Sequence, residues 1–426
     1  MNIKQNIIMQ AMEAKQASLE LSLLRSENKN NILNAIADAL DANIDEILFR
    51  NSIDIEAAQN ANLSAAFVDR LSLTKDRITE MANSVRKITK MQDPIGEEID
   101  NHTSENGLLI KKIRVPLGVI GIIYESRPNV TIDTIALCIK SGNAIILKGG
   151  SESLNSNHIL TKIAIKAASE KGLPNGAIQF IDTSDRDAIT ELLRLNNLID
   201  VIIPRGSQKM IDAIVEMSKI PVIQHGKGLC HTYIDKDANL DMAVKIAYNA
   251  KVQRPGVCNA METLLVHKDI ADKFLPIMSA KFLENGVELR GCEKTIRSLS
   301  KTEGNLSTAI KPATDEDWDE EYLDLILSIK IVDSLKDAIN HIQKHGTGHS
   351  EAIVTDDKAA AARFLAEVDA ATVYHNASTR FTDGGQFGLG AEVGISTQKL
   401  HARGPMGIRE LTSYKFVVYG DGQTRE

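Results

Sequence analysis

Residues 119–150 have the sequence VIGIIYESRPNVTIDTIALCIKSGNAIILKGG, and this stretch decides the fold class. Its apolar runs predict buried strands at 119–123 and 144–147, and the segment between them predicts a helix over 132–140. A strand, a helix and a strand within about 30 residues form a βαβ unit, whose strands are parallel in one sheet. The stretch therefore predicts an α/β fold built on a parallel sheet.

The second of these strands ends at a lysine and two glycines. Lys148 precedes Gly149 and Gly150, and Ser151 and Glu152 follow them. Ligands of open α/β sheets bind at the carboxyl ends of the strands. A lysine at such an end, before a glycine turn and a helix start, suits a phosphate or a ribose hydroxyl. A solvated surface lysine is the alternative, and this residue by itself does not exclude it.

Further βα repeats follow, as far as a strand predicted over 201–203. That strand leads into Arg205, Gly206 and Ser207. Gly206 and Ser207 at a strand-to-helix turn suit a phosphate, and Arg205 suits an adenosine 2′-phosphate, which favours NADP. The chain contains neither GxGxxG nor GxxxxGK[ST], so it would bind a dinucleotide without the usual Rossmann fingerprint.

The two ends of the chain have a different pattern. Residues 1–92 carry apolar side chains at helical spacing, which predicts a layer of helices. The segment 97–113 predicts a hairpin or an extended arm, and 414–419 predicts a C-terminal strand. An arm of this kind is typical of an oligomer contact.

A cysteine loop follows the first sheet region. Residues 253–263 have the sequence QRPGVCNAMET, in which Cys258 lies between a Pro-Gly turn and an apolar strand predicted at 264–266. A cysteine on a loop at a sheet edge is accessible and firmly positioned, as a nucleophile must be. Arg254 adds positive charge that favours the thiolate. The alternative is a small buried side chain, the usual state of a free cysteine. Residues 264–380 continue the α/β pattern and predict a second parallel-sheet domain.

The composition is that of an ordinary globular protein. The 426 residues are enough for two domains, and the net charge of −8 argues against a general nucleic-acid binder. No apolar run approaches the ~18 residues of a membrane-spanning helix, and the N-terminus has no apolar signal core. These features predict a cytoplasmic protein that binds neither nucleic acid nor a membrane.

The four cysteines form no CxxC pair, so neither a disulfide framework nor a zinc ribbon is predicted. His225, Cys230 and His231 lie close together in the sequence and raise the possibility of a metal site. Zinc needs three or four ligands. No fourth ligand is evident nearby, so no metal is predicted.

Four longer motifs point to one family. The motifs are 124–131 (YESRPNVT), 140–150 (KSGNAIILKGG), 253–263 (QRPGVCNAMET), and 387–396 (FGLGAEVGIS) together with 401–407 (HARGPMG). With these motifs in this order, the sequence resembles the γ-glutamyl phosphate reductase family, a branch of the aldehyde dehydrogenase superfamily. Ser207 departs from the pattern of that family, which has a second glycine at this position.

The resemblance implies an aldehyde dehydrogenase-like fold of two parallel-sheet α/β domains and a small β element. In this arrangement, residues 1–96 and 114–235 bind NADP(H), and residues 236–410 form the catalytic domain. The element formed by 97–113 and 411–426 would make the contact of a homo-oligomer, either a dimer or a tetramer.

The resemblance also implies a reaction, the NADPH-dependent reduction of L-glutamate 5-phosphate to L-glutamate 5-semialdehyde through a thioester on Cys258. Asn129 and the backbone N–H of Cys258 would form the oxyanion hole. Lys148 would contact the adenosine ribose or its phosphate, and Glu321 the nicotinamide ribose. The product is expected to cyclise to 1-pyrroline-5-carboxylate.

The implied substrate is anionic and therefore needs cations. Arg127, Lys227, Arg254 and Arg403 lie in the motif loops and are candidates for binding its phosphate and α-carboxylate. A labile acyl phosphate also suggests direct transfer from glutamate 5-kinase, which would be a separate partner.

Two other functions remain open at this point. Hydrolytic aldehyde dehydrogenases use a glutamate to activate water, and the corresponding segment here, 224–228 (QHGKG), contains no carboxylate. That absence favours reduction over oxidation. The second alternative is a non-catalytic protein that keeps the fold, and the presence of Cys258, Asn129 and the cationic loops counts against it.

Overall fold

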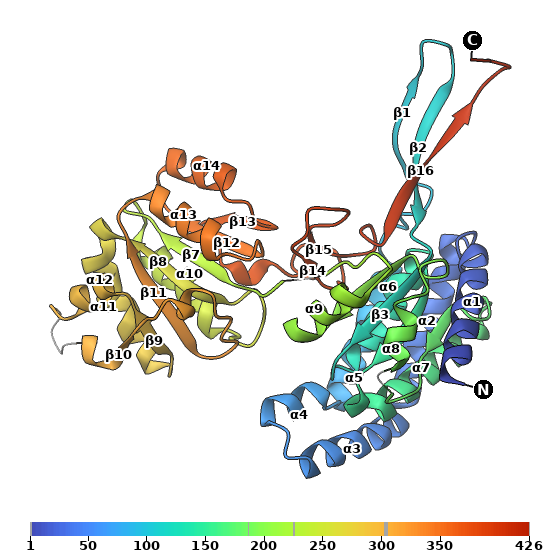
Figure 1. The fold of residues 1–426 in the computed structure, drawn as a ribbon, viewed down its shortest axis with the longest axis horizontal. Helices are drawn as coiled ribbons and strands as arrows, with labels where there is room; N and C mark the ends of the chain where they lie inside the picture. The colour runs from blue at the N-terminus through green and yellow to red at the C-terminus, as the bar shows by residue number, and fades with distance from the viewer. Residues whose placement is uncertain (1, 186, 225, 302–305, 426) are drawn as a thin grey trace. The chain divides into compact units, whose positions relative to one another are not determined.

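The computed structural model describes residues 2–185, 187–224, 226–301 and 306–425. The chain divides into two compact units (Figure 1). Unit 1 comprises Met1–Gln224, Gly388–Gly394 and Met406–Glu426, and unit 2 comprises His225–Phe387 and Ile395–Pro405.

Unit 1 is built on a parallel four-stranded sheet with the order β5-β4-β3-β6. The predicted βαβ unit is present, because α6 connects β3 to its parallel neighbour β4. All residues of these two strands are buried, as expected for strands that are covered on both faces. The elements are β3 (Val119–Tyr124), α6 (Asn129–Lys140), β4 (Ala144–Gly149), β5 (Ile178–Phe180) and β6 (Val201–Arg205).

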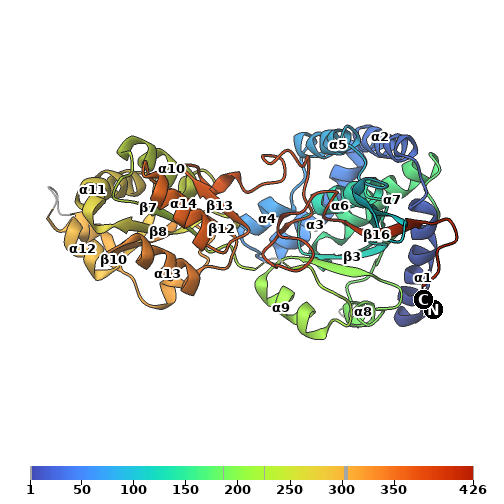
Figure 2. The ribbon, with the colours of Figure 1, turned by 90° about the horizontal axis from the view of Figure 1, so that it is seen from above.

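Helices cover both faces of this sheet (Figure 2). One face packs against α1 (Ile3–Leu21), α8 (Asp187–Leu192) and α9 (Gln208–Met217), whose apolar side chains form one core with β3 and β4. The other face carries α6 and α7 (Leu154–Ser169). The remaining helices confirm the predicted N-terminal helical layer: α2 (Ser26–Ala42), α3 (Ile44–Asn60), α4 (Ala65–Leu71) and α5 (Lys75–Thr89).

A separate antiparallel sheet of three strands also belongs to unit 1 (Figure 1). The hairpin of β1 (Glu98–Thr103) and β2 (Leu109–Pro116) pairs with β16 (Thr412–Tyr419). The predicted arm and the predicted C-terminal strand therefore form one element. Tyr414 and Phe416 of β16 are exposed. The oligomer contact assigned to this element stays a prediction.

Unit 2 contains a parallel seven-stranded sheet with the order β10-β9-β11-β8-β7-β12-β13, which confirms the second parallel sheet. Its strands are β7 (Cys230–Ile234), β8 (Met261–His267), β9 (Glu288–Gly291), β10 (Ile310–Pro312), β11 (Ile326–Val332), β12 (Ser350–Val354) and β13 (Thr372–His375).

Five helices cover the two faces of this sheet. The apolar side chains of α10 (Leu240–Val252), α11 (Lys268–Glu284) and α12 (Glu293–Leu299) pack against β8, β9 and β11. A second core joins α13 (Leu335–His345) and α14 (Lys358–Glu367) to β7, β8 and β12. A short antiparallel pair, β14 (Ile395–Ser396) and β15 (Gly404–Pro405), completes the unit.

One sequence-based assignment differs from the structure. Between β6 and β7, Ile202 and Val222 form an isolated parallel bridge. β7 belongs to unit 2, although the domain boundary was predicted after 235, because β7 pairs with β8 and β12. The functional roles assigned to the domains stay predictions.

Candidate functional site

Cys258 lies on the loop that connects α10 to β8, and its side chain is half-buried. Because the loop precedes β8, Cys258 lies at the amino edge of the seven-stranded parallel sheet. Gly228 and Glu321 lie at the same edge, before β7 and β11. The predicted nucleophile is therefore partly accessible, and residues from several strand connections surround its main chain.

An ion pair joins the two ends of the cysteine loop. The Lys251 Nζ lies 2.6 Å from the Glu262 Oε2, and both side chains are completely buried. Burial raises the pKa of Glu262 to about 7 and lowers the pKa of Lys251, and in each case the opposite charge of the partner opposes the shift. The pair connects the last turn of α10 to the start of β8, and so holds the base of the loop.

The main chain at Cys258 rests directly on Gly228. A Cβ atom at Gly228 would lie 2.0 Å from the Cys258 carbonyl oxygen, so only glycine permits this approach. The Cys230 Sγ donates a hydrogen bond to the same carbonyl at 3.2 Å. The backbone of the candidate nucleophile is therefore fixed from behind by two residues of the chain that enters β7.

A third support comes from the segment after β13. The Asn259 Nδ2 donates to the Thr382 carbonyl at 2.8 Å, and the Thr379 Oγ1 donates to the Asn259 carbonyl at 2.8 Å. Between these two residues, the Arg380 Nε donates to the Gln253 Oε1 at 2.9 Å. The segment 379–382 thus lies along the cysteine loop and presents a guanidinium group to it.

Glu321 contacts the glycine that supports Cys258. Its Oε1 accepts the Gly228 N–H at 2.8 Å, and burial raises the pKa of Glu321 while this hydrogen bond opposes the shift. A carboxylate therefore reaches the segment 224–228 from elsewhere in the chain, although that segment contains none. Its predicted contact with a nicotinamide ribose stays a prediction.

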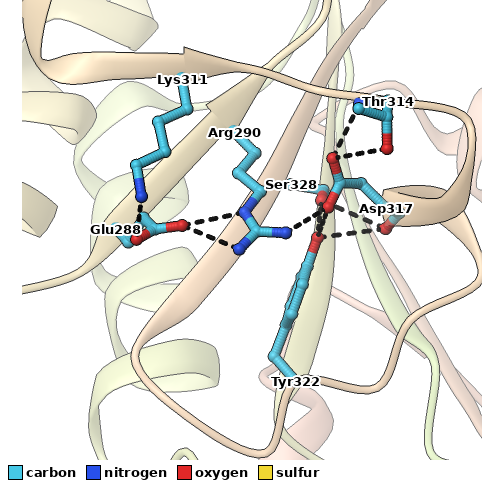
Figure 3. A network of polar contacts seen from close by, with 7 residues as sticks. All are labelled: Glu288, Arg290, Lys311, Thr314, Asp317, Tyr322 and Ser328. Carbon is cyan, nitrogen blue, oxygen red and sulfur yellow. Dashed lines mark hydrogen bonds and ion pairs between the residues drawn. The ribbon is translucent and has the colours of Figure 1, made fainter.

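A polar network orders the segment that carries Glu321 (Figure 3). Arg290 bridges Glu288 and Asp317, with its Nη1 2.5 Å from the Asp317 Oδ1. The Tyr322 hydroxyl donates to the Asp317 Oδ1 at 2.8 Å and also contacts the Ser328 hydroxyl. Because Tyr322 directly follows Glu321, these contacts restrain the main chain next to Glu321.

Asn129, the predicted oxyanion-hole residue, is the first residue of α6 in unit 1. Its side-chain amide donates to the Asp133 Oδ2 at 3.1 Å. Desolvation raises the pKa of Asp133 to about 6, with the Asn129 hydrogen bond opposing the shift, although part of the side chain remains open to solvent. Asn129 and Cys258 belong to different units. Their joint oxyanion hole stays a prediction.

The predicted ribose-binding residues lie at the carboxyl end of β4. Lys148 is buried, its Nζ donates to the Gly149 carbonyl at 2.8 Å, and burial lowers its pKa while the Glu152 charge opposes the shift. An ammonium has three N–H donors, and this carbonyl takes one of them. Ser151 begins the short helix Ser151–Ser153. With a cation, a hydroxyl and a carboxylate at one strand end, these residues fit the hydroxyl groups of a nicotinamide dinucleotide.

The turn after β6 contains an anion supplied by the chain itself. Glu125 accepts hydrogen bonds from the Ser207 N–H at 2.8 Å and from the Ser207 hydroxyl at 3.0 Å. A Cβ atom at Gly206 would also come within 2.7 Å of the Glu125 carboxyl carbon. The phosphate predicted at Gly206 and Ser207 would therefore require Glu125 to move. Arg205 lies close to Gly394, where an added Cβ would meet its guanidinium.

The four predicted substrate cations have different environments. Arg127 and Arg254 are exposed. The Lys227 Nζ donates to the Asp319 carbonyl at 3.5 Å. Arg403 forms an ion pair with Asp369 at 2.8 Å, so its charge is already partly neutralised. Arg127 belongs to unit 1 and the other three belong to unit 2.

Sequence reasoning did not identify Arg380 as a site residue, nor the supporting roles of Gly228 and Cys230. The polar and glycine-rich stretch 376–409 indicates a loop that lines a site, but this pattern does not single out Arg380 within it. The sequence places Gly228 in the segment 224–228 and Cys230 beside two histidines, and neither pattern indicates a contact with Cys258. Their contacts with Cys258 become visible only when β7 and β8 are paired.

The metal hypothesis finds no support in the described part of the chain, which contains no group of three or more His, Cys, Asp or Glu side chains placed to hold a metal ion. The His231 Nδ1 instead lies 3.0 Å from the buried Glu351 carboxylate. His225 lies outside the described residues. Across the described ranges, every helix falls short of the length and apolar content that crossing a membrane requires.

Comparisons with known proteins identify the family. The family model described as "Aldehyde dehydrogenase family" matches residues 3–289. The γ-glutamyl phosphate reductase of Halothermothrix orenii is 53% identical over 426 residues and that of Clostridium acetobutylicum is 54% identical over 426 residues. Each match covers 100% of both chains.

The solved structure of γ-glutamyl phosphate reductase from Thermotoga maritima has the same fold. It superimposes with a TM-score of 0.94 at 46% sequence identity and covers 99% of this chain and 100% of that chain. The chain therefore belongs to the aldehyde dehydrogenase family and, within it, to the γ-glutamyl phosphate reductases.

Proposed function

We propose that this chain reduces L-glutamate 5-phosphate to L-glutamate 5-semialdehyde and phosphate with NADPH, the second step of proline biosynthesis from glutamate. The relatives that match over the full length are named for this activity. The observation that carries the proposal is the geometry of Cys258, a half-exposed thiol whose main chain rests on Gly228. The semialdehyde then cyclises to 1-pyrroline-5-carboxylate.

Cys258 performs the covalent step. Its thiolate attacks the carbonyl carbon of the acyl phosphate and forms a C–S bond. The bond between that carbon and the bridging oxygen then breaks, and phosphate leaves with the electron pair. The Asn129 amide and the Cys258 N–H would stabilise the negative oxygen of the tetrahedral intermediate, each by ~3–4 kcal/mol. Because phosphate is a good leaving group, the step needs no strong general acid.

The fixed main chain at Cys258 supports this chemistry. Gly228, Cys230 and Asn259 restrain the loop on different sides, so the thiol and the adjacent N–H keep one geometry during the reaction. When bound, the nicotinamide supplies the hydride that the thioester carbon receives. The resulting thiohemiacetal then releases the Cys258 thiolate and the aldehyde.

Two groups of residues would hold the cofactor. Lys148, Ser151 and Glu152 at the end of β4 would bind the adenosine ribose, and Arg205 is a candidate for the 2′-phosphate that distinguishes NADPH from NADH. Glu321 would bind the nicotinamide ribose. Members of the aldehyde dehydrogenase family use nicotinamide cofactors, and the choice of NADPH is part of this proposal.

A hydrolytic aldehyde dehydrogenase is the second candidate, because the Glu321 carboxylate contacts Gly228 at the back of Cys258. A carboxylate in that position with a pKa raised by burial has the character of a general base for water. In that case a thioester on Cys258 would be hydrolysed and would not be exchanged with phosphate.

The reverse reaction tests the two candidates directly. Pyrroline-5-carboxylate, phosphate and NADP⁺ are supplied, and NADPH formation is followed by absorbance. The wild type is expected to reduce NADP⁺ only when phosphate is present, and Cys258→Ala is expected to lose at least about 10⁴-fold in activity. Cys292→Ala is the matched control, since Cys292 is similarly half-buried but lies at the start of α12, where its thiol contacts the nearby Thr295 hydroxyl.

Each other outcome has a definite meaning. NADP⁺ reduction without phosphate supports the hydrolytic candidate. Full activity in Cys258→Ala contradicts both candidates. An inactive but folded wild type supports a non-catalytic protein.

The proposal extends to partners and location. The three-stranded sheet of β1, β2 and β16, with its exposed Tyr414 and Phe416, would form the contact of a homo-oligomer. Glutamate 5-kinase would supply the labile acyl phosphate by transient contact. A biosynthetic enzyme of this kind is expected in the cytoplasm.

A further inference from the structure

Arg380 lies beside Cys258 in unit 2, although the two residues are distant in the sequence. Its Nε donates to the Gln253 Oε1 at 2.9 Å, and its carbonyl accepts the Asn259 side-chain amide at 3.4 Å. Thr379 adds a hydrogen bond to the Asn259 carbonyl at 2.8 Å. Arg380 is thus attached to the cysteine loop on both sides of Cys258, and its side chain is half-buried.

Arg254 brings a second positive charge to the cysteine loop, four residues before Cys258, and its side chain is exposed. Burial lowers the pKa of Arg380, the positive charge of Arg254 lowers it further, and the charges of Cys258 and Asp383 oppose both effects. Among the described residues, no carboxylate forms an ion pair with either arginine. The Asp383 Oδ1 instead accepts the N–H groups of residues 385 and 386.

Two guanidinium charges near one nucleophile repel each other, and an anion that binds there reduces this repulsion. The planar guanidinium is suited to bidentate binding of phosphate or carboxylate oxygens. Because Gln253 accepts from the Arg380 Nε, the Nη donors remain for such an anion. The site therefore has the charge, the donors and the position that an anionic group next to the reacting carbon requires.

We propose that Arg380, together with Arg254, binds the phosphoryl group of the acyl phosphate beside Cys258 and so determines the specificity for phosphate. The inference rests on the proposed function, because that function defines which anion approaches Cys258. In an acyl phosphate the phosphorus is two bonds from the carbonyl carbon, whereas the α-carboxylate of a glutamyl group is four bonds away. Because the phosphoryl group is closer to the reacting carbon, a cation attached to the cysteine loop itself is placed to bind it.

In the forward direction, Arg380 stabilises the charge that the phosphate carries away as the C–O bond breaks and the C–S bond forms. In the reverse direction, it positions inorganic phosphate to attack the thioester carbon, and the Cys258 thiolate leaves with the electron pair. Neither direction requires an additional oxidant or reductant for this step.

Alkylation of Cys258 tests the proposal without relying on catalysis. Iodoacetamide is added with increasing inorganic phosphate, and the modified Cys258 peptide is quantified by mass spectrometry. Phosphate is expected to protect the wild-type thiol, and Arg380→Gln is expected to need ~10-fold or more phosphate for half-protection, because a charge-assisted hydrogen bond is lost. The ratio of rates with and without phosphate cancels any change in the intrinsic reactivity of the thiol.

Two further variants control the experiment. Arg380→Lys keeps the charge without the planar group and is expected to give intermediate protection, which also covers the case in which Arg380→Gln fails to fold. Arg363→Gln, on α14, removes an exposed arginine paired with Glu367 and is expected to behave as wild type. Fluorescence of the single tryptophan, Trp318, reports the folding of unit 2 in each variant.

Several results would overturn the proposal. These are equal half-protection in wild type and Arg380→Gln, no protection of the wild type by phosphate, or protection by glutarate but not by phosphate. In the reverse reaction catalysed by Arg380→Gln, the proposal requires the KM for phosphate to rise above the wild-type value while the KM for the semialdehyde stays nearly constant. If the wild type shows no phosphate-dependent turnover but phosphate protection depends on Arg380, the proposed function fails and the anion site stands.

Discussion

The candidate residues of the two units lie at opposite kinds of sheet edge. In unit 1, Lys148 and Arg205 lie where β4 and β6 end, at the carboxyl edge of the four-stranded sheet. In unit 2, Gly228, Cys258 and Glu321 precede β7, β8 and β11, at the amino edge of the seven-stranded sheet. The rule that ligands bind at carboxyl edges therefore finds the cofactor candidates and does not find the nucleophile.

The polar groups at the two edges are also used differently. At the carboxyl edge of unit 1, the Ser207 N–H and hydroxyl are bound by the carboxylate of Glu125. At the amino edge of unit 2, the hydrogen bonds hold the main chain around Cys258, and the thiol stays half-exposed. We infer that a reactive side chain can lie at either edge, provided that contacts from other strand connections fix its backbone.

The largest expected effect is at the amino edge of unit 2. There, Glu262→Gln is expected to lower the free energy of unfolding. This change leaves the buried Lys251 ammonium without its partner, and removing one member of a buried pair costs about 3–5 kcal/mol. Urea unfolding is followed by Trp318 fluorescence at about pH 8, above the Glu262 pKa of about 7. The unfolding midpoint is expected to fall.

The double variant Lys251→Met/Glu262→Leu is the matched control, because it replaces both charges by apolar groups of similar size. It is expected to cost much less than the single change, since no unpaired charge remains buried. If the single variant is as stable as the double variant, the ion pair does not hold the base of the cysteine loop.

The second effect concerns the geometry of the amino edge. In Gly228→Ala the new Cβ would lie 2.0 Å from the Cys258 carbonyl oxygen, so the loop must shift. Displacing a catalytic group by about 1 Å costs ~10²-fold, and kcat of the reverse reaction is expected to fall by this factor. Gly256→Ala, in the cysteine loop itself, provides the comparison, because its Cβ would be in ordinary contact with the Leu323 carbonyl at 3.5 Å. Equal losses of kcat in the two variants would show that the close contact between Gly228 and Cys258 does not position the nucleophile.

The smallest effect tests the carboxyl edge of unit 1. The pKa of Asp133 is raised from 3.8 to about 6, so the folded state binds a proton that the unfolded chain has already released. Stability therefore falls as the pH rises from about 4 to about 6. Asp133→Asn is expected to remove this dependence, and the difference is about 1 kcal/mol after allowance for partial exposure.

Urea midpoints at pH 4.5 and pH 7, followed by far-UV circular dichroism, measure this difference between wild type and variant. Trp318 lies in unit 2 and Asp133 in unit 1, so the fluorescence transition serves as an internal control. An unchanged pH dependence in the variant, or an equal change in the fluorescence transition, would assign the effect to other groups.

Local patterns in the sequence determined much of the fold. Apolar runs 119–123 and 144–147 separated by a helical segment were sufficient to predict parallel strands, because burial on both faces leaves a continuous apolar signal. Cys258 and its loop were recognisable for a similar reason, since turn residues and the next strand lie within a few positions of it. The longer motifs supplied the family.

The tertiary structure decided which distant residues surround these elements. Arg380 reaches Gln253 across 127 positions, and Glu321 reaches Gly228 across 93. Sequence spacing carries no signal for such contacts, because strand order β11-β8-β7-β12 differs from chain order. For the same reason, only the structure shows that Glu125 occupies the Ser207 turn. The sequence alone therefore determined the kind of fold and the candidate nucleophile, while the paired strands determined what holds that nucleophile in place.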